Sequence, residues 1–282
     1  MTPILVTGST GTIGRQVVSQ LLSTDAQVRA MTRNPDAADL PSGVEVVRGD
    51  LTDPASLDRC LEGIEAVFLV WTAPAAAVPG AVERIAKQAR RAVFLTAPHK
   101  TPHPLFQQTN PMAAMHAEIE RRIAASGLQW TFLRPGMFAA NALSWWGPQI
   151  RSGDVVRWPY ADVPTAPIHE RDVAAVAVRA LLAEGHEGAE YVLTGPESLS
   201  HREQVITIGE GIGRPLRFEE ISPEEARREL PFPAPAMDML LEAWAAALGH
   251  PALVTSTVEE ITGRPARTFR DWVADHAAEL RT

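Results

Sequence analysis

Three glycines near the start of the chain have the spacing of a dinucleotide-binding turn. Gly8, Gly11 and Gly14 lie between a short aliphatic run at residues 4–6 and a helical pattern. In such a turn the first glycine permits a tight bend, the second lets the backbone approach a pyrophosphate, and the third lets helix and strand pack closely. The amides of the helix N-terminus then supply an anion site. A turn that binds nothing is the alternative, but the strand and helix on either side favour nucleotide binding. Further expected contacts within the turn are Thr10, Thr12 and Ile13.

The residue that follows the second predicted strand selects between the two nicotinamide cofactors. That strand covers residues 27–31, and Arg33 comes just after it. An acidic residue at this place binds the ribose hydroxyls of NAD, whereas an arginine accommodates the 2′-phosphate of NADP. Arg33 therefore favours NADP(H), with NAD(H) still possible. The alternative is a surface arginine in a turn.

The residues that could handle a proton are less familiar. Neither Tyr160 nor Tyr191 is followed by a lysine four residues later, so no Tyr-x-x-x-Lys pair exists in the chain. His116 and Glu120 lie one turn apart on one face of a predicted helix. His116 could donate a hydrogen bond or a proton to a substrate carbonyl, with Glu120 orienting it. The alternative is a surface ion pair worth only about 0.3–0.5 kcal/mol. A metal site is disfavoured because no third ligand is evident.

Alternating strands and helices must position these groups. Their order predicts an α/β fold with a doubly wound parallel (Rossmann) sheet and a smaller C-terminal α/β substrate lobe. We expect the Rossmann domain to cover residues 1–140, with part of 167–194 returning to it, and the lobe to cover 141–282. The predicted strands are 4–6, 27–31, 44–47, 66–70, 92–96, 130–133 and 191–194, and the predicted helices include 112–125 and 171–182.

Ligands of open α/β sheets bind at the carboxyl ends of the strands. Trp71 and Thr72 follow the fourth predicted strand and should border the cofactor, while Thr96 ends the fifth. A proline-rich loop at residues 98–111 comes next and carries Lys100, a further catalytic candidate. Loops of this length are uncommon unless they are functional or disordered. Two interpretations of this loop remain: a flap that faces the substrate, or a mobile surface loop. His99, His103 and Phe106 also lie in this loop.

Aromatic residues are concentrated after residue 137 and could form the walls of a pocket for a flat ligand. Phe138, Trp145 and Trp158 are the candidates, and Phe106 would add to them. Ordinary packing of the lobe is the alternative, and we favour it for Trp146 and Trp158. His276 lies in an apolar helical stripe near the end of the chain, which predicts a structural role.

The composition argues against several classes of function. The chain has 282 residues, a formal net charge of −8 and no run rich in Lys and Arg, which disfavours nucleic-acid binding. Cys60 is the single cysteine, so neither an internal disulfide nor a thiolate metal cluster is possible. No apolar run reaches the length of a membrane span, and the N-terminus leaves no room for a signal peptide. We expect a cytoplasmic monomer or homodimer without a membrane partner or a metal.

Two segments resemble the NmrA-like group of atypical short-chain dehydrogenases. Residues 7–14 read TGSTGTIG, and residues 116–138 read HAEIERRIAASGLQWTFLRPGMF. The second segment is especially similar to bacterial NADPH:quinone reductases, and residues 262–269 resemble actinobacterial members of the group. The resemblance implies that Asp50 and Leu51 contact adenine and that the helix face with His116 points toward the nicotinamide. It further implies cofactor contacts at Pro135 and Phe138, and a polar substrate contact at Asn141.

The resemblance implies an NAD(P)H-dependent oxidoreductase that reduces a quinone or an aromatic polyketide-like carbonyl by hydride transfer. A quinone would make the missing tyrosine less important, because hydride addition yields a hydroquinone anion of moderate basicity. Binding geometry would then matter more than proton transfer. Two alternatives remain open, because the group also includes NAD(P)-sensing regulators without turnover and tailoring enzymes of aromatic polyketides. The expected partner is a small aromatic substrate.

Overall fold

The computed structural model describes residues 2–107 and 111–281. Its centre is a parallel sheet of seven strands in the order β3-β2-β1-β4-β5-β6-β9, which confirms the predicted doubly wound fold. All neighbouring strands are parallel, and the order in which they are added changes side between β1 and β4, which is the point where such sheets bind ligands. The strands are β1 (Pro3–Val6), β2 (Gln27–Thr32), β3 (Glu45–Arg48), β4 (Ala66–Val70), β5 (Arg91–Leu95), β6 (Gln129–Pro135) and β9 (Ala189–Leu193).

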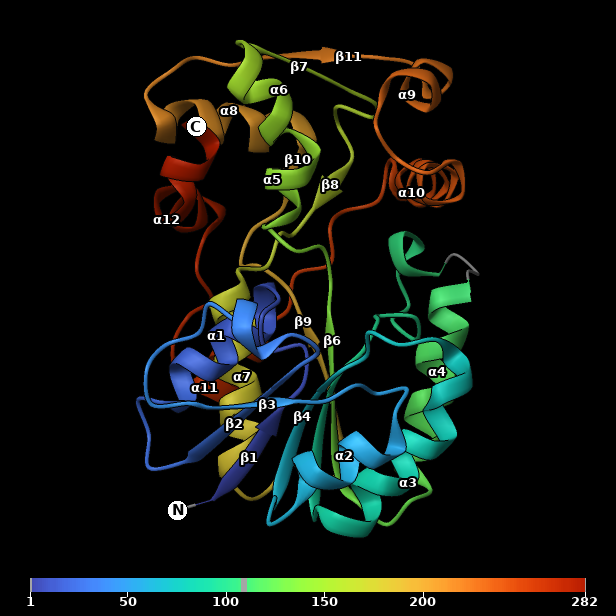
Figure 1. Cartoon of the computed structure of the whole chain (residues 1–282). Coiled ribbons are helices and arrows are strands. Elements are labelled where there is room, and N and C mark those ends of the chain that lie inside the picture. The colour runs from blue at the N-terminus through green and yellow to red at the C-terminus, as the bar shows by residue number, and fades with distance from the viewer. Residues whose placement is uncertain (1, 108–110, 282) are drawn as a thin grey trace.

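Helices cover both faces of this sheet (Figure 1). One face carries α1 (Thr12–Leu21), α7 (Glu170–Leu182) and α11 (Thr257–Thr262), and the other carries α2 (Pro54–Leu61), α3 (Val78–Gln88) and α4 (Pro111–Ala124). The central strands β1, β4 and β5 are mostly buried on both sides, which explains their near-continuous aliphatic sequences. Short 3₁₀ turns lie in the connections, namely η1 (Pro35–Ala37), η2 (Ala75–Ala77) and η3 (Pro104–Phe106).

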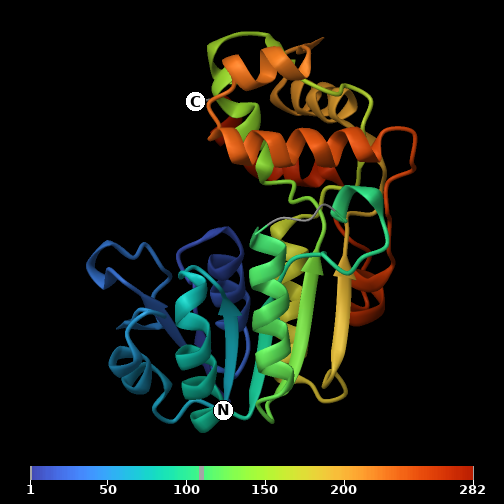
Figure 2. The same cartoon turned by 90° about the vertical axis from the view of Figure 1, so that its right-hand side faces the viewer.

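A second region stands over the carboxyl ends of the strands, toward which the strand arrowheads point (Figure 2). Two small sheets belong to it: β7 pairs in parallel with β11, and β8 pairs antiparallel with β10. The elements are α5 (Asn141–Trp145), α6 (Gly147–Ser152), β7 (Val155–Trp158), β8 (Pro164–Thr165), β10 (Leu199–Ser200), α8 (His201–Ile212), β11 (Arg217–Glu220), α9 (Pro223–Glu229), α10 (Ala234–Ala247) and α12 (Phe269–Arg281).

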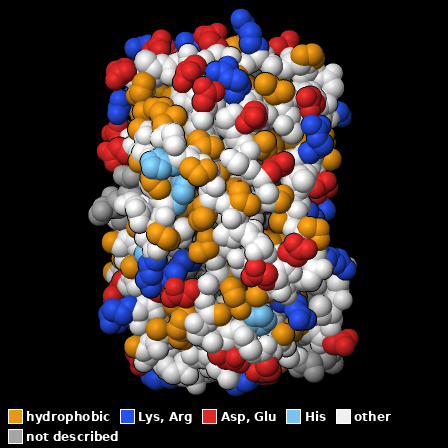
Figure 3. All heavy atoms as spheres, turned by 180° about the vertical axis from the view of Figure 1, so that it is seen from behind, with side chains coloured by type: hydrophobic (Ala, Val, Ile, Leu, Met, Phe, Trp, Pro, Cys, Tyr) orange, Lys and Arg blue, Asp and Glu red, His pale blue; other side chains and the backbone are white. Residues whose placement is uncertain are grey.

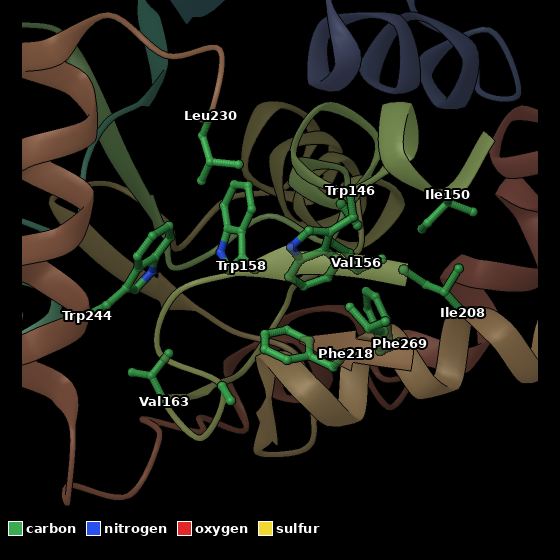
Figure 4. Close-up of a cluster of buried hydrophobic side chains, with 14 of the residues drawn as sticks. Trp146, Ile150, Val156, Trp158, Val163, Ile208, Phe218, Leu230, Trp244 and Phe269 are labelled. Carbon is green, nitrogen blue, oxygen red and sulfur yellow. The ribbon is translucent and has the colours of Figure 1, made fainter. Parts of the chain in front are cut away.

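Aromatic side chains fill the core of this second region. Trp158 lies between Trp146 and Trp244 (Figure 4), and all three have no exposed surface. The Trp158 ring stacks on Trp145 at a centroid distance of 5.7 Å. Trp158 is therefore part of the core, which is the packing alternative that we favour for it, and it has no exposed surface with which to contact a substrate. Trp145 is only partly buried, but it packs against the same cluster.

Capping residues fix several helix ends in the way their sequence indicates. Asp53 accepts a hydrogen bond from the Ala55 amide at the start of α2. Ser200 and Glu203 form a reciprocal capping box at the start of α8. That helix ends at Gly213, which takes a left-handed conformation with φ +69°. Gly213 therefore terminates this helix.

The surface mixes charges of both signs. Acidic and basic side chains are interspersed with hydrophobic ones on the face shown in Figure 3. Within the described ranges, no helix has both the length and the apolarity that crossing a membrane requires.

Candidate functional site

The glycine turn is packed so closely that side chains are excluded from it. Gly8 has φ +59°, and a Cβ there would lie 2.9 Å from the Cβ of Val70. A Cβ on Gly14 would lie 2.1 Å from the Gly8 carbonyl oxygen, which no adjustment of a side chain could relieve. The first turn of α1 contains no acidic residue and no side-chain cap. Its amides are therefore available to an anionic ligand.

A first cavity of about 500 Å³ extends from this turn over the ends of β2 and β3, and we call it the adenosine cavity. Arg33 is exposed at its edge and forms no ion pair with any carboxylate of the described residues. Asp50 accepts hydrogen bonds from the amide and the hydroxyl of Thr52, both at 2.8 Å. These bonds, with a smaller effect of Arg33, lower the pKa of Asp50. Seven of the expected cofactor contacts line the adenosine cavity: Gly8, Thr10, Gly11, Arg33, Asp50, Leu51 and Thr72. Seven further lining residues were not selected from the sequence: Met31, Thr32, Gly49, Thr52, Val70, Ala73 and Pro74.

A second cavity of about 790 Å³ continues from the same turn toward α5 and α12, and we call it the nicotinamide cavity. The expected contacts that line it are Gly8, Gly11, Thr12, Ile13, Gly14, Phe138 and Asn141. Leu95, at the end of β5, also lines it. The residues that hold the two halves of a dinucleotide would therefore lie in adjoining cavities that share Gly8, Gly11 and Val70.

A third, smaller cavity of about 230 Å³ lies between α10 and the loop after β5, and we call it the acceptor cavity. No residue lines both this cavity and the nicotinamide cavity, but both border the ends of β5 and β6: Leu95 and Phe138 line the nicotinamide cavity, whereas Ala97 and Met137 line the acceptor cavity. The wall is almost entirely apolar. Its residues are Ala97, Pro98, His99, Leu105, Phe106, Met112, Ala113, Gly136, Met137, Met239, Leu240, Ala243 and Trp244. Phe106, which the sequence analysis names as a candidate substrate contact, is among these residues.

A buried carboxylate lies behind this wall. Glu120 on α4 is only 2% exposed, and it accepts hydrogen bonds from Thr96 Oγ1 at 2.9 Å and Arg134 Nη2 at 2.8 Å. Lys100 Nζ lies 3.0 Å from Glu120 Oε2. Burial alone would raise the pKa of Glu120, but these bonds from Arg134, Lys100 and Thr96 lower it. The carboxylate is therefore charged at neutral pH.

Arg134 joins this carboxylate to a second one. It pairs with Glu120 and also with Glu190 on β9, and Lys100 Nζ lies 3.7 Å from Glu190 Oε1. Two carboxylates and two cations thus balance in charge, which is what a buried ionic cluster requires. The structure brings together Thr96, Lys100 and Glu120 as candidates, whereas sequence reasoning missed Arg134 and Glu190.

His116 does not occupy the place expected for it. No hydrogen bond joins it to Glu120 among the described residues, and it lines none of the three cavities. Its ring instead lies edge-on to Phe94 at a centroid distance of 5.8 Å. Burial, together with the nearby His99, lowers the pKa of His116, so the ring is neutral at physiological pH. The expectation that Glu120 orients His116 is wrong.

His99 is the polar residue that sequence reasoning did not select. It lines the acceptor cavity, and its Nδ1 lies 3.0 Å from the Ala97 carbonyl oxygen. Its Nε2 lies 3.6 Å from Glu120 Oε2 and is buried without a hydrogen-bond partner among the described atoms. Its position four residues after the end of β5 was the available signal. The sequence alone could not place it beside Glu120.

Three further expected contacts lie away from the cavities. Trp71 is 7% exposed and packs in the core under α2 and α3. Pro135 is buried in β6, where it pairs with Leu193. Trp145 packs in the second region, as described above. None of these side chains lines any of the three cavities.

His276 was not expected to contact a ligand, but it lies at a cavity. It lines the nicotinamide cavity together with Glu170 and Glu279, although its helical stripe predicted a structural role. Its stacking on Trp272, with a centroid distance of 4.7 Å, explains that pattern. One ring can serve both packing and an ionic contact.

Comparison with known proteins now decides the family. A model of the NAD(P)H-binding family matches residues 8–184. The chain belongs to this family. The match covers the glycine turn, Arg33, Glu120 and Arg134, and it confirms the resemblance to NmrA-like atypical short-chain dehydrogenases.

Relatives match the chain over nearly its whole length. A (4-alkanoyl-5-oxo-2,5-dihydrofuran-3-yl)methyl phosphate reductase of Streptomyces griseus is 42% identical, over 97% of this chain and 98% of its own. An NAD(P)H azoreductase of Xenophilus azovorans is 34% identical, over 98% of both chains. The crystal structure of the NADPH-dependent quinone oxidoreductase QOR2 of Escherichia coli with NADPH gives a TM-score of 0.79 at 25% identity, over 96% of this chain and 99% of that one. The expectation that this chain is an enzyme of the atypical short-chain reductase type is confirmed.

Proposed function

We propose that this enzyme transfers a hydride from NADPH to a small acceptor in which a carbon–carbon double bond is conjugated with a carbonyl group. Quinones and acylated butenolides are two such compounds. The observation that carries the proposal is that the nicotinamide and acceptor cavities both border the ends of β5 and β6. A cofactor held by the glycine turn would direct its reactive end to these strand ends.

The preference for NADPH rests on Arg33. The residue lies at the end of β2, on the edge of the adenosine cavity, and is not engaged by a carboxylate of the described residues. A guanidinium at this place can bind a 2′-phosphate through two parallel hydrogen bonds. No acidic side chain follows β2 directly to bind ribose hydroxyls in its stead.

The acceptor cavity suits an apolar, conjugated compound. Its walls offer aromatic and methionine side chains, and methionine adapts to ligands of irregular shape. When bound, the reduced nicotinamide supplies the hydride. The acceptor then takes up one proton, so the balanced products are the reduced acceptor and NADP⁺. Because conjugation delocalises the negative charge onto oxygen, a single donor in the wall suffices.

We infer that His99 is this donor. A carbonyl oxygen only accepts, so the contact with Ala97 requires a proton on Nδ1 of His99. Nε2 can donate only when the ring carries a proton on both nitrogens, and the Glu120 carboxylate lies 3.6 Å from it. Glu120 is a positioning residue in this scheme, held by Thr96 and Arg134. Lys100, whose side chain is 52% exposed, contacts the same carboxylate and links it to solvent.

The experiment is an assay of NADPH oxidation with a panel of acceptors. It contains menadione, juglone, an acylated butenolide with and without a phosphate group, and a saturated ketone as the unconjugated control. We expect turnover with at least one conjugated compound and none with the saturated ketone. Intact binding of NADPH without turnover of any conjugated compound would contradict the proposal and favour a regulator that senses NAD(P).

A further inference from the structure

The C-terminal helix α12 closes one side of the nicotinamide cavity. His276 and Glu279 of α12 line this cavity together with Glu170 of α7 and the glycine turn. Residues more than 250 positions apart in the chain therefore meet at one ligand site. The two carboxylates are an unexpected lining for a cavity that receives an anionic cofactor, because like charges repel.

The ring of His276 offsets these two carboxylates. Its Nε2 lies 2.6 Å from Glu170 Oε1, and its Nδ1 lies 2.7 Å from Glu279 Oε1. Carboxylate oxygens accept hydrogen bonds, so both ring nitrogens must donate. This geometry requires the imidazolium form of His276. Burial alone would lower the pKa of His276, but the bonds to Glu170 and Glu279 raise it above its usual value.

The other charged groups around the ring are already paired. Asp275 Oδ2 lies 3.1 Å from His169 Nε2 and 2.9 Å from Arg171 Nη1. His169 accepts from the Arg171 amide through Nδ1, and the same nitrogen lies 3.3 Å from Glu170 Oε2. Arg15 on α1 is turned toward Asp39, 3.1 Å away. Loss of the His276 proton therefore leaves Glu170 and Glu279 uncompensated beside the cavity.

Glu170 supplies a second observation. Its side chain is 2% exposed, yet its Oε2 atom is buried without a hydrogen-bond partner among the described atoms. A buried charged oxygen in this condition is unfavourable and depends on its remaining partners. His276 is the partner that carries a compensating charge.

We propose that His276 is a cofactor-affinity residue, whose imidazolium neutralises Glu170 and Glu279 and so permits tight binding of NADPH. Deprotonation of His276 weakens this binding, because two carboxylates then face the anionic cofactor. The proposal rests on the binding of NADPH in the nicotinamide cavity and not on the nature of the acceptor. A residue of the C-terminal helix α12 thereby contributes to the affinity for the cofactor.

The test measures the dissociation constant of NADPH at pH 7.0 and at pH 9.5 by calorimetry. For the wild type we expect binding to weaken about tenfold at the higher pH, as for one charge acting through a partly buried site. His276→Gln should bind about tenfold more weakly at pH 7.0 and show little further change. His250→Gln is the control, because His250 is exposed and lines none of the three cavities.

A second ligand separates this electrostatic role from a structural one. Adenosine 2′,5′-bisphosphate lacks the nicotinamide half of the cofactor, and no residue of α12 lines the adenosine cavity. Its affinity should therefore be the same for wild type and His276→Gln. Equal loss of both ligands would overturn the proposal, as would wild-type NADPH affinity in the variant at both pH values.

Glu279→Gln provides an independent result of opposite sign. The Glu279 side chain is 62% exposed, so its replacement leaves the core intact. Removal of this carboxylate should tighten NADPH binding at pH 9.5 by several-fold. Unchanged or weaker binding would contradict the proposal even where His276→Gln does not fold.

Discussion

The cofactor side and the acceptor side of this enzyme are built in different ways. In the proposed function the glycine turn binds the cofactor through its backbone, and the three glycines that shape this turn lie within one short segment. The acceptor cavity is lined by side chains from the loop after β5, the end of β6 and α10, which are far apart in the chain. A site formed by closely packed backbone does not tolerate added side chains. A site lined by side chains tolerates substitutions, and these substitutions alter its specificity. The following predictions test this contrast.

The largest effect is expected at the glycine turn. Gly14→Val would place a Cβ 2.1 Å from the Gly8 carbonyl oxygen, so the strand and helix must separate. We expect loss of detectable NADPH binding by calorimetry, with a lowered Tm. Gly80→Ala is the control, because a Cβ there meets nothing within 4 Å. NADPH affinity in Gly14→Val equal to that of the control would show that the turn is not the cofactor site.

On the acceptor side, His99→Gln should lower kcat by about 100-fold, the lower part of the range for a general acid. NADPH affinity should remain within about twofold of wild type, because His99 lines neither cofactor cavity. His116→Gln is the matched control on the neighbouring α4, and it should retain most of the activity. A greater loss of kcat in the control than in His99→Gln would transfer the role to His116.

A smaller effect is expected for Arg33→Ala. Loss of the guanidinium should weaken NADPH binding by about tenfold to 100-fold, the range for a hydrogen-bonded charge pair. NADH binding should change by less than about twofold, because NADH lacks the 2′-phosphate. Equal losses for both cofactors would remove the assignment of Arg33.

The smallest effect concerns the pH dependence of stability. The pKa of Glu170 is lowered in the fold by His169 and His276, although burial opposes this, and the pKa of His276 is raised. The pair therefore stabilises the fold most between the usual values, 4.5 for Glu and 6.5 for His. This stabilisation is lost as pH rises through the folded pKa of His276. Urea unfolding of wild type and His276→Gln should differ most at pH 5.5 to 6.5 and converge at pH 9.5.

The sequence was sufficient where the structure is local. The glycine turn, the capping box at Ser200 and the strand at Ala66–Val70 follow from neighbouring residues alone. Boundaries shifted where pairing extends a strand beyond its aliphatic run, as in β6, which continues through Arg134 to Pro135. Local patterns carry this information because backbone geometry depends on adjacent residues.

The acceptor side could not be predicted in the same way. Glu120 looks like a surface helix residue in the sequence, and only the packing of α4 against β6 brings it to Arg134. Trp158 is of a residue type that often lines ligand pockets, but its side chain lies in the core of the second region. His276 was expected to have only a structural role, but it lines the nicotinamide cavity. Long-range contacts decide the role of each of these side chains, and one sequence does not reveal them.

The most direct test of the central claim is to fill the acceptor cavity. Ala243 on α10 lines that cavity, whereas Ala245 on the same helix is exposed. With a conjugated acceptor that the wild type reduces, Ala243→Phe should lower kcat/KM by about 100-fold or more while NADPH affinity is unchanged, and Ala245→Phe should behave as wild type. Wild-type kcat/KM in Ala243→Phe would show that the acceptor binds elsewhere and would contradict the account.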